Sequence, residues 1–227
     1  MSTSAIIVAA GAGKRFGSSL PKQFVELNSK PVLAHAIEKF ENCPAIDEII
    51  VVVSCDYLKY VKTKIINCYG FKKIKAVVSG GNTRQDSVFN GLKVTDENAE
   101  IIAIHDGARP LVPSDAITAS IECAKAEDAC ILGVKTNNTI KILDDNGFVI
   151  GTPNRDILYE IQTPQTFKRE LIFFAYEKAA EDNFIATDDS ALVERLGARV
   201  KIIEGSYQNI KITTEEDMLL ANLIYNR

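Results

Sequence analysis

The stretch AIIVAAGAGKRFG, residues 5–17, decides the fold, because an apolar run leads directly into a glycine-rich turn. Glycine lets the backbone turn sharply and brings its N–H groups close to a ligand. Arg15 lies in this turn and Lys22 follows shortly after it, so positive charge gathers where those N–H groups point. The pattern predicts a strand-to-helix loop that binds a polyphosphate. A glycine-rich turn with solvated cations is the alternative.

The spacing of the glycines excludes the two commonest phosphate-binding loops. A dinucleotide fingerprint G-x-G-x-x-G that starts at Gly11 requires glycine at position 16, where this chain has Phe16. A P-loop requires Ser or Thr after its Gly-Lys pair, and Arg15 stands in that position. An NAD-dependent oxidoreductase is therefore disfavoured.

The composition is that of an ordinary globular protein, with 46% hydrophobic and 25% charged residues among 227. This length is enough for one domain with a full core, which we expect to span residues 1–227. The net charge of −4 makes nucleic acid or an anionic membrane surface an unsuitable partner. An anion site must come from locally clustered cations.

The cysteine pattern points to a reducing compartment. The count of five is odd and no C-x-x-C pair occurs, so neither a disulfide framework nor a zinc cage is indicated. The N-terminal residues do not resemble a signal peptide, and no run approaches the ~20 apolar residues of a membrane span. We therefore expect a cytoplasmic protein.

Short apolar runs alternate with amphipathic segments along the chain. The runs predict strands at 5–10, 48–53, 74–78, 101–105, 129–134 and 200–204. The segments between and after them predict helices at 31–42, 57–68, 82–94, 114–126, 169–181 and 188–196, with a last helix that ends at 225. The strands are apolar throughout, as in an α/β doubly wound, mostly parallel sheet of the Rossmann-like type, which binds ligands at the carboxyl ends of its strands.

Two helix starts carry capping signals. Ser114 is expected to be the N-cap of its helix, and Thr213 followed by Glu216 predicts a capping box for the last helix.

One segment, residues 135–157, interrupts the alternation of strands and helices. It contains two β-rich runs, 139–143 and 148–151, separated by DDNG. An Asn-Gly pair between such runs is a strong hairpin signal. Because an isolated hairpin is only marginally stable in water, this one must pack on something, either the parent domain or a second subunit.

Further candidate residues follow the later strands. In HDGARP, residues 105–110, Asp106 suits Mg²⁺ and Arg109 suits a phosphate, whereas a plain Asp–Arg salt bridge is the alternative. His105 is expected to pack at the strand end and not to act as a base. The turn GGNTRQDS, residues 80–87, adds Arg84, and Lys211 lies near the last capping signal. Residues 163–167 and 187–189 are predicted to be structured loops without an assignable function.

Taken together, these motifs resemble the 2-C-methyl-D-erythritol 4-phosphate cytidylyltransferase family of the non-mevalonate isoprenoid pathway. The matching stretches occur in order over nearly the whole chain: residues 9–17, 21–24, 80–87, 105–110, 139–141, 163–167, 187–189 and 209–213. Ribitol-5-phosphate cytidylyltransferases share most of this scaffold and remain the alternative. The Ala-Ala-Gly first loop and the Asp-Gly-Ala-Arg motif favour the erythritol enzyme.

The resemblance implies a role for each matching residue. Arg15 and Lys22 would stabilise the charge that develops at the α-phosphate of CTP, while Arg155 and Lys211 would position the sugar phosphate. Asp106 would hold Mg²⁺ and contact the acceptor. The remaining acceptor contacts would be Thr139 and Arg109, and the nucleotide pocket would be lined by Ala9, Ala10, Gly11, Gly13, Gly80, Arg84 and Ser87.

The resemblance also implies a homodimer in which the hairpin arm at 135–157 embraces the partner, so that Thr139 and Arg155 serve the neighbouring site. A non-catalytic nucleotide-sensing module on the same fold is the alternative from another class. A sensor has no need of cations around the α-phosphate, which argues against it.

Overall fold

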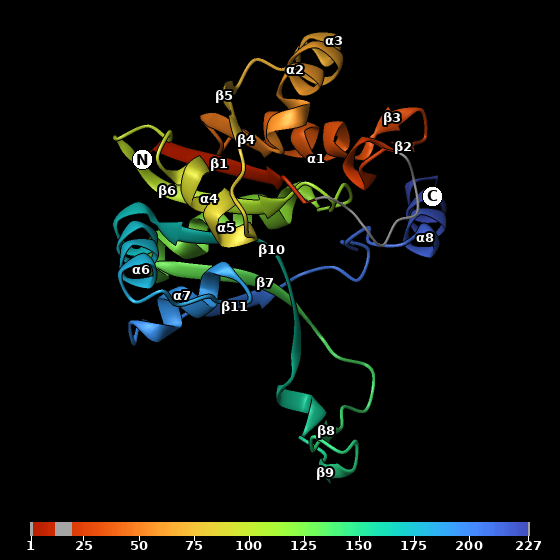
Figure 1. The fold of residues 1–227 in the computed structure, drawn as a ribbon, viewed down its shortest axis with the longest axis vertical. Helices are drawn as coiled ribbons and strands as arrows, with labels where there is room; N and C mark the ends of the chain where they lie inside the picture. Colours follow the sequence, from red (N-terminus) through yellow and green to blue (C-terminus); the bar gives the residue numbers. More distant parts are fainter. Residues whose placement is uncertain (1, 12–19, 227) are drawn as a thin grey trace.

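The computed structural model describes residues 2–11 and 20–226 and centres on one seven-stranded sheet (Figure 1). Within it β10 is antiparallel to both of its neighbours, and the other pairs are parallel. The expected doubly wound, mostly parallel α/β sheet is confirmed. The strand order is β11 (Lys201–Glu204), β7 (Ala129–Lys135), β10 (Tyr159–Lys168), β6 (Ala99–Asp106), β1 (Ser2–Ala9), β4 (Glu48–Val53) and β5 (Ile74–Ser79).

Helices cover both faces of this sheet. One face carries α1 (Val32–Glu41), α5 (Ser114–Glu127) and a helical segment over 55–69, whereas the other carries α4 (Arg84–Leu92), α6 (Arg169–Glu181) and α7 (Asp189–Arg195). A smaller apolar cluster joins α8 (Glu215–Tyr225) to the start of α1 and to the short strand β2 (Glu26–Leu27), which pairs with β3 (Lys30–Pro31). The 3-10 turn η2 (Lys22–Phe24) lies directly before β2.

The two helical layers explain why the strands are apolar throughout. In β1, Ala5 and Ile7 pack into the cluster beneath α1 and α5, while Ile6 between them packs into the cluster beneath α4 and α6. Because successive side chains of a strand point to opposite faces, a sheet covered on both faces selects apolar residues at every position.

The ends of several helices differ from the sequence-based expectation. Ser114 is the first residue of α5, and Pro113 is its N-cap. The capping box of α8 is made by Thr214 with Asp217, one residue beyond the predicted pair Thr213 and Glu216, since both pairs have the same spacing. The helix expected at 57–68 is divided into η3 (Cys55–Tyr57), α2 (Leu58–Tyr60), a π-helical turn η4 (Val61–Ile66) and α3 (Asn67–Tyr69).

Residues 163–167, for which the sequence predicts a loop, belong to the strand β10. They lie in the middle of the sheet, between β6 and β7. Proline cannot donate to a strand ladder, so Pro164 argued against a central strand. The structure accommodates it because the pairing with β7 shifts between Ile161 and Gln165, which leaves the proline at an irregular position.

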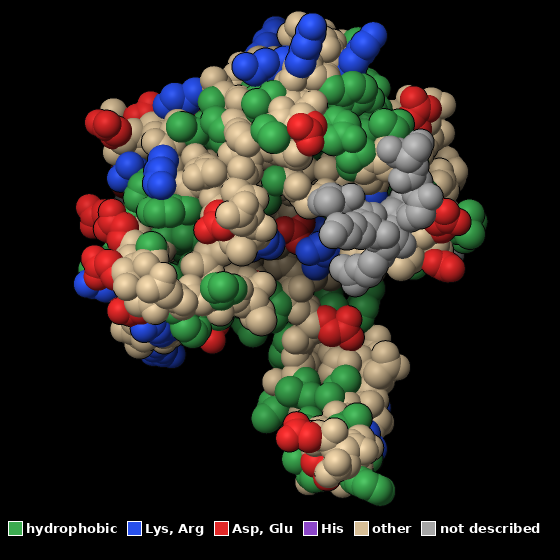
Figure 2. Space-filling view, in the orientation of Figure 1, with side chains coloured by type: hydrophobic (Ala, Val, Ile, Leu, Met, Phe, Trp, Pro, Cys, Tyr) green, Lys and Arg blue, Asp and Glu red, His purple; other side chains and the backbone are tan. Residues whose placement is uncertain are grey.

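The predicted hairpin forms an arm that projects from the sheet between β7 and β10 (Figure 1). It contains β8 (Ile142–Leu143), β9 (Val149–Gly151) and the turn η5 (Arg155–Ile157), and Gly147 has the positive φ of 86° that the tight turn needs. Apolar side chains gather on its surface (Figure 2), and Phe148 and Ile157 are 70% and 74% exposed. The arm therefore does not pack on its own domain.

The structure also shows the state of the cysteines and the length and polarity of the helices. All five cysteines are free thiols, as the pattern predicted. Over residues 2–11 and 20–226, every helix is too short or too polar to cross a bilayer.

Candidate active site

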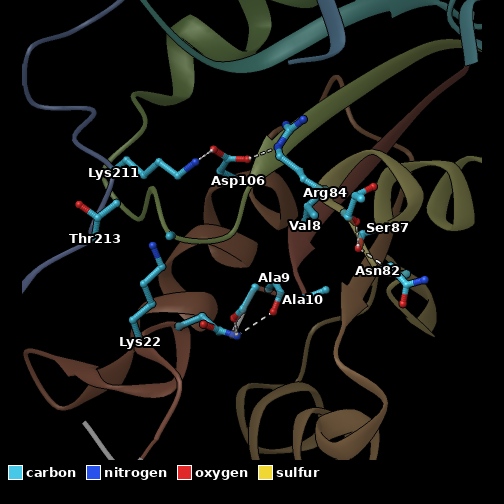
Figure 3. Close-up of a pocket in the computed structure, with 15 residues that line it drawn as sticks. Val8, Ala9, Ala10, Lys22, Asn82, Arg84, Ser87, Asp106, Lys211 and Thr213 are labelled. Carbon is cyan, nitrogen blue, oxygen red and sulfur yellow. Dashed lines mark hydrogen bonds and ion pairs between the residues drawn. The ribbon is translucent and has the colours of Figure 1, made fainter. Parts of the chain in front are cut away.

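A cavity of about 430 Å³ opens at the carboxyl edge of the sheet, where β1 and β6 end (Figure 3). Its walls come from five separate parts of the chain: the end of β1, the turn η2, the β5–α4 loop, the end of β6 and the segment before α8. Ligand sites of doubly wound sheets lie at this edge. The described residues that line it are Val8, Ala9, Ala10, Gly11, Lys22, Gln23, Gly81, Asn82, Thr83, Arg84, Ser87, Asp106, Ala108, Lys211 and Thr213.

Gln23 fixes the first wall of the cavity. Its buried amide Nε2 donates to the carbonyl oxygen of Ala9 at 2.8 Å and to that of Gly11 at 3.1 Å. These bonds hold the end of β1 against η2, and so place Lys22 beside the first loop. Figure 3 shows the ammonium group of Lys22 pointing into the cavity.

The β5–α4 loop forms the opposite wall and packs tightly on the first. A Cβ added at Gly80 would lie 2.4 Å from the Cβ of Ala10 and 2.7 Å from Oγ of Ser87, so only glycine fits there. A capping box between Thr83 and Asp86 starts α4 directly after this loop. The close approach brings the ends of β1 and β5 together around the cavity.

Asp106 lies at the end of β6 with its carboxylate held between two cations. Nζ of Lys211 is 2.7 Å from Oδ2, and Nε of Arg84 is 3.1 Å from Oδ1. Burial alone would raise the pKa of Asp106, but the positive charges of Arg84 and Lys211 lower it well below its usual range. The carboxylate therefore stays ionised at the floor of the cavity.

The positive charge of Arg84 is balanced by a second carboxylate in addition to that of Asp106. Its two terminal nitrogens form a fork with Asp189, whose side chain is 1% exposed. Burial alone would lower the pKa of Arg84, yet the carboxylates of Asp189 and Asp106 raise it above the ordinary value. The guanidinium therefore remains charged.

His105 and Arg109 are both engaged within the protein framework. Nδ1 of His105 pairs with Oγ1 of Thr163 and its Nε2 pairs with the carbonyl oxygen of Arg109, each at 3.0 Å. Burial lowers the pKa of His105 to about 4, so the ring is neutral near pH 7. Arg109 donates to the carbonyl oxygens of Asn209 and Ile161.

The structure brings together most of the described residues selected from the sequence. Gly80 lies directly behind the cavity wall. Arg109, Thr139 and Arg155 do not line the cavity of their own chain, because the first is held by backbone carbonyls and the other two lie on the arm. Gly13 and Arg15 lie outside the described residues. The selected residues that line the cavity are Ala9, Ala10, Gly11, Lys22, Arg84, Ser87, Asp106 and Lys211.

Sequence reasoning assigned no role to two residues that shape the site. Gln23 follows Lys22 in the quoted PKQ stretch, but its bonds to the first loop depend on tertiary packing. Asp189 belongs to the Thr-Asp-Asp stretch at 187–189, which carried no spacing signal, and it supports Arg84 from a distance of 105 residues in the chain.

Comparison with known proteins identifies the family. A family model for 2-C-methyl-D-erythritol 4-phosphate cytidylyltransferase matches residues 3–227. The chain belongs to this family. It is thus a nucleotidyltransferase of isoprenoid biosynthesis, a cytidylyltransferase that acts on 2-C-methyl-D-erythritol 4-phosphate, and nothing in the comparisons favours ribitol 5-phosphate.

Relatives and solved structures agree with the family model. A protein of that name from Alkaliphilus oremlandii is 50% identical over 222 residues, which is 98% of this chain and 94% of the relative. One from Caldanaerobacter subterraneus is 45% identical over the full length of both. A crystal structure of the 4-diphosphocytidyl-2C-methyl-D-erythritol synthase from Anaerococcus prevotii, 38% identical, superposes with a TM-score of 0.89 over 100% of this chain and 96% of the other.

The contacts of Gln23 give a first prediction. In Gln23→Leu the carbonyls of Ala9 and Gly11 lose their donor, and an unmade buried bond costs about 1–3 kcal/mol. Since this wall of the cavity then loosens, we expect CTP to bind about 10-fold more weakly, as measured by titration calorimetry. Gln85→Leu is the control, because Gln85 bonds to backbone groups of Phe184 and Ala186 outside the cavity. Equal CTP affinity in Gln23→Leu and wild type would contradict this role.

Proposed function

We propose that the cavity holds CTP and 2-C-methyl-D-erythritol 4-phosphate side by side and aligns their phosphates for transfer of CMP. The observation that carries the proposal is that Lys22, Arg84 and Lys211, which are far apart in the sequence, converge on one cavity around Asp106 (Figure 3). Cations gathered from separate loops suit two polyanionic substrates in a chain whose net charge is −4.

The reaction joins two anions. An oxygen of the sugar phosphate attacks the α-phosphorus of CTP, a new P–O bond forms, and the bond from the α-phosphorus to the bridging oxygen of the β-phosphate breaks. The products are 4-diphosphocytidyl-2-C-methyl-D-erythritol and pyrophosphate. A phosphate monoester has a second pKa near ~6 and is largely a dianion at neutral pH, so it is already a nucleophile.

Repulsion and alignment are therefore the obstacles, and the site needs cations more than a base. The state of His105 agrees with this, since it is buried, neutral and bonded on both ring nitrogens. In the proposed mechanism Lys22, together with Arg15 of the first loop, stabilises the charge that develops at the α-phosphate. Lys211 and Arg155 position the attacking phosphate.

The described lining residues fit a magnesium ion that is bound mainly through the substrates. Asp106 is their single carboxylate, and each of its oxygens has one donor among residues 2–11 and 20–226 and, with respect to these, keeps a further lone pair. Mg²⁺ is usually held by one or two carboxylates together with substrate phosphates. We propose that Asp106 contributes the protein ligand, and that the ion neutralises charge on the phosphate oxygens when bound.

The arm supports the proposal of a homodimer. Its apolar residues are exposed although a two-stranded hairpin is marginal by itself, and a second copy of this chain would cover them. Thr139 and Arg155, with Arg109 behind the cavity, are proposed to complete the acceptor site. The first two would come from the partner's arm. The free thiols agree with a cytoplasmic location, which we also propose.

A matrix of nucleotides and acceptors tests the function. We expect pyrophosphate release with CTP and 2-C-methyl-D-erythritol 4-phosphate, and at least about 10²-fold less with ribitol 5-phosphate, since the site is built for polar contacts to one polyol. Each pair is assayed with Mg²⁺ by coupled detection of pyrophosphate. If pyrophosphate were released with ribitol 5-phosphate and not with 2-C-methyl-D-erythritol 4-phosphate, the proposed acceptor would be wrong. If CTP bound but no acceptor led to pyrophosphate release, the result would support a nucleotide sensor.

Lys22→Ala tests the role of the loop cation. Loss of one well-placed donor to a developing charge costs ~10²–10³ in turnover, and we expect that loss here. The melting temperature should stay near that of wild type, because a partly exposed lysine adds little to packing. Lys59→Ala, on the surface of α2, is the matched control. Near-normal turnover of Lys22→Ala would remove Lys22 from the mechanism.

Mixed dimers test whether the arm acts across subunits. Lys22→Ala and Arg155→Ala subunits, each expected to be strongly impaired alone, are mixed, and we expect activity to return, because one site of each heterodimer then contains both Lys22 and Arg155. Lys22→Ala mixed with Lys211→Ala is the control that should stay inactive, since both residues line the same cavity. Absence of recovery despite proven subunit exchange would place Arg155 in the site of its own chain.

A further inference from the structure

Arg84 lies between two carboxylates and uses a different part of its guanidinium on each. Its terminal nitrogens form a fork with Asp189, in which Nη1 is 3.0 Å from Oδ1 and Nη2 is 2.8 Å from Oδ2. Nε alone is directed to Asp106, whose Oδ1 lies 3.1 Å away. A bidentate fork orients an arginine more firmly than a single bond does. Asp189 thus decides which way Arg84 faces.

Asp189 is itself held rigidly. Its side chain is buried, and Oδ1 accepts a hydrogen bond from the hydroxyl of Tyr176 at 2.5 Å. Its backbone N–H donates to Oε1 of Gln165, which also accepts from the N–H of Ser190. The first turn of α7 is therefore fastened to β10, and Asp189 cannot follow Arg84 if that side chain moves.

Because of this fork, Arg84 uses only a small part of the hydrogen-bonding capacity of Asp106. Because both terminal nitrogens are committed to Asp189, Arg84 takes one acceptor site of Asp106, and Lys211 takes one on the other oxygen. An ionised carboxylate offers about four acceptor sites, so the sites that the described residues leave open can serve groups bound in the cavity.

We propose that Asp189 is a positioning residue, which holds Arg84 back so that Asp106 stays available to the acceptor substrate. The proposal rests on the proposed placement of the sugar phosphate at Asp106. Without the charge of Asp189, Arg84 has the carboxylate of Asp106 left beside it, and the planar fork of a guanidinium matches a carboxylate bidentately. Arg84 would then turn its fork onto Asp106 and compete with both Lys211 and the substrate.

A purely structural role for Asp189 predicts something different. A buried ion pair that only joins α4 to α7 would, when broken, lower stability and active-enzyme content together. It would leave the KM values of the remaining folded enzyme unchanged. The positioning role instead predicts a selective change in KM for the sugar phosphate.

The test is Asp189→Asn in the full-length enzyme, assayed by pyrophosphate release with Mg²⁺. We expect kcat/KM for the sugar phosphate to fall about 10- to 100-fold through a raised KM, as misplacement of a positioning group does, with the KM for CTP changed less than about 3-fold. Asp182→Asn is the matched control, because Asp182 pairs with Arg195 on the exposed side of α6 and α7. It should behave as wild type.

A second pair of variants separates positioning from folding. Arg84→Met leaves Asp189 buried without a counter-charge, and adding Asp189→Asn removes that charge, so the double variant should regain melting temperature. It should not regain activity, and its kcat/KM should lie within about 2-fold of Arg84→Met, because Asp189 acts only through Arg84. Tyr176→Phe, which keeps the packing and removes one bond to Asp189, provides a milder variant should Asp189→Asn not fold, with a KM raised about 3-fold.

Three results would overturn the proposal: an unchanged KM for the sugar phosphate in both Asp189→Asn and Tyr176→Phe, equal rises in both KM values, or an additive loss in the double variant. If the proposed function itself were wrong, the result would be distinguishable from these three, because the wild-type enzyme would then release no pyrophosphate with the sugar phosphate.

Discussion

The carboxylate of Asp106 has to remain charged at the buried end of β6, and it does so because Arg84 and Lys211 lie against it. Burial alone would favour the neutral acid, and a cation on each oxygen reverses that preference. The same contacts tie α4 and the segment before α8 to the end of β6. These two ion pairs thus join three segments at the floor of the cavity and keep the carboxylate there charged.

The fold makes this arrangement possible because parallel strands deliver their following loops to one edge. The described residues that directly follow β1, β5 and β6 meet there, although they are separated by many residues in the chain. The reversed strand β10 contributes from the opposite direction, since Thr163 accepts a hydrogen bond from the backbone N–H of Asp106. Gln165 on the same strand fastens the start of α7, and so sets the position of Asp189.

Local sequence patterns predicted the structure correctly wherever the pattern lay within a single strand or turn. The apolar runs located the parallel strands, and Asn146-Gly147 located the hairpin, because each pattern reflects a local preference of the backbone. They were insufficient where packing overrode a local preference. Pro164 hid a central strand, and the capping box of α8 begins at Thr214, in a helix whose Met218 and Ala221 pack with Leu27 of β2.

The sequence by itself determined the class of sheet and more than half of the described lining residues, because strand periodicity is local and the family motifs run in order along the chain. Only the tertiary structure decided how the charges pair. Lys211 meets Asp106 and Arg84 faces Asp189 across 105 residues, and the exposed face of the arm is left without cover in its own chain. Such contacts depend on where separate elements come to rest in the folded molecule, and no spacing within the chain encodes that directly.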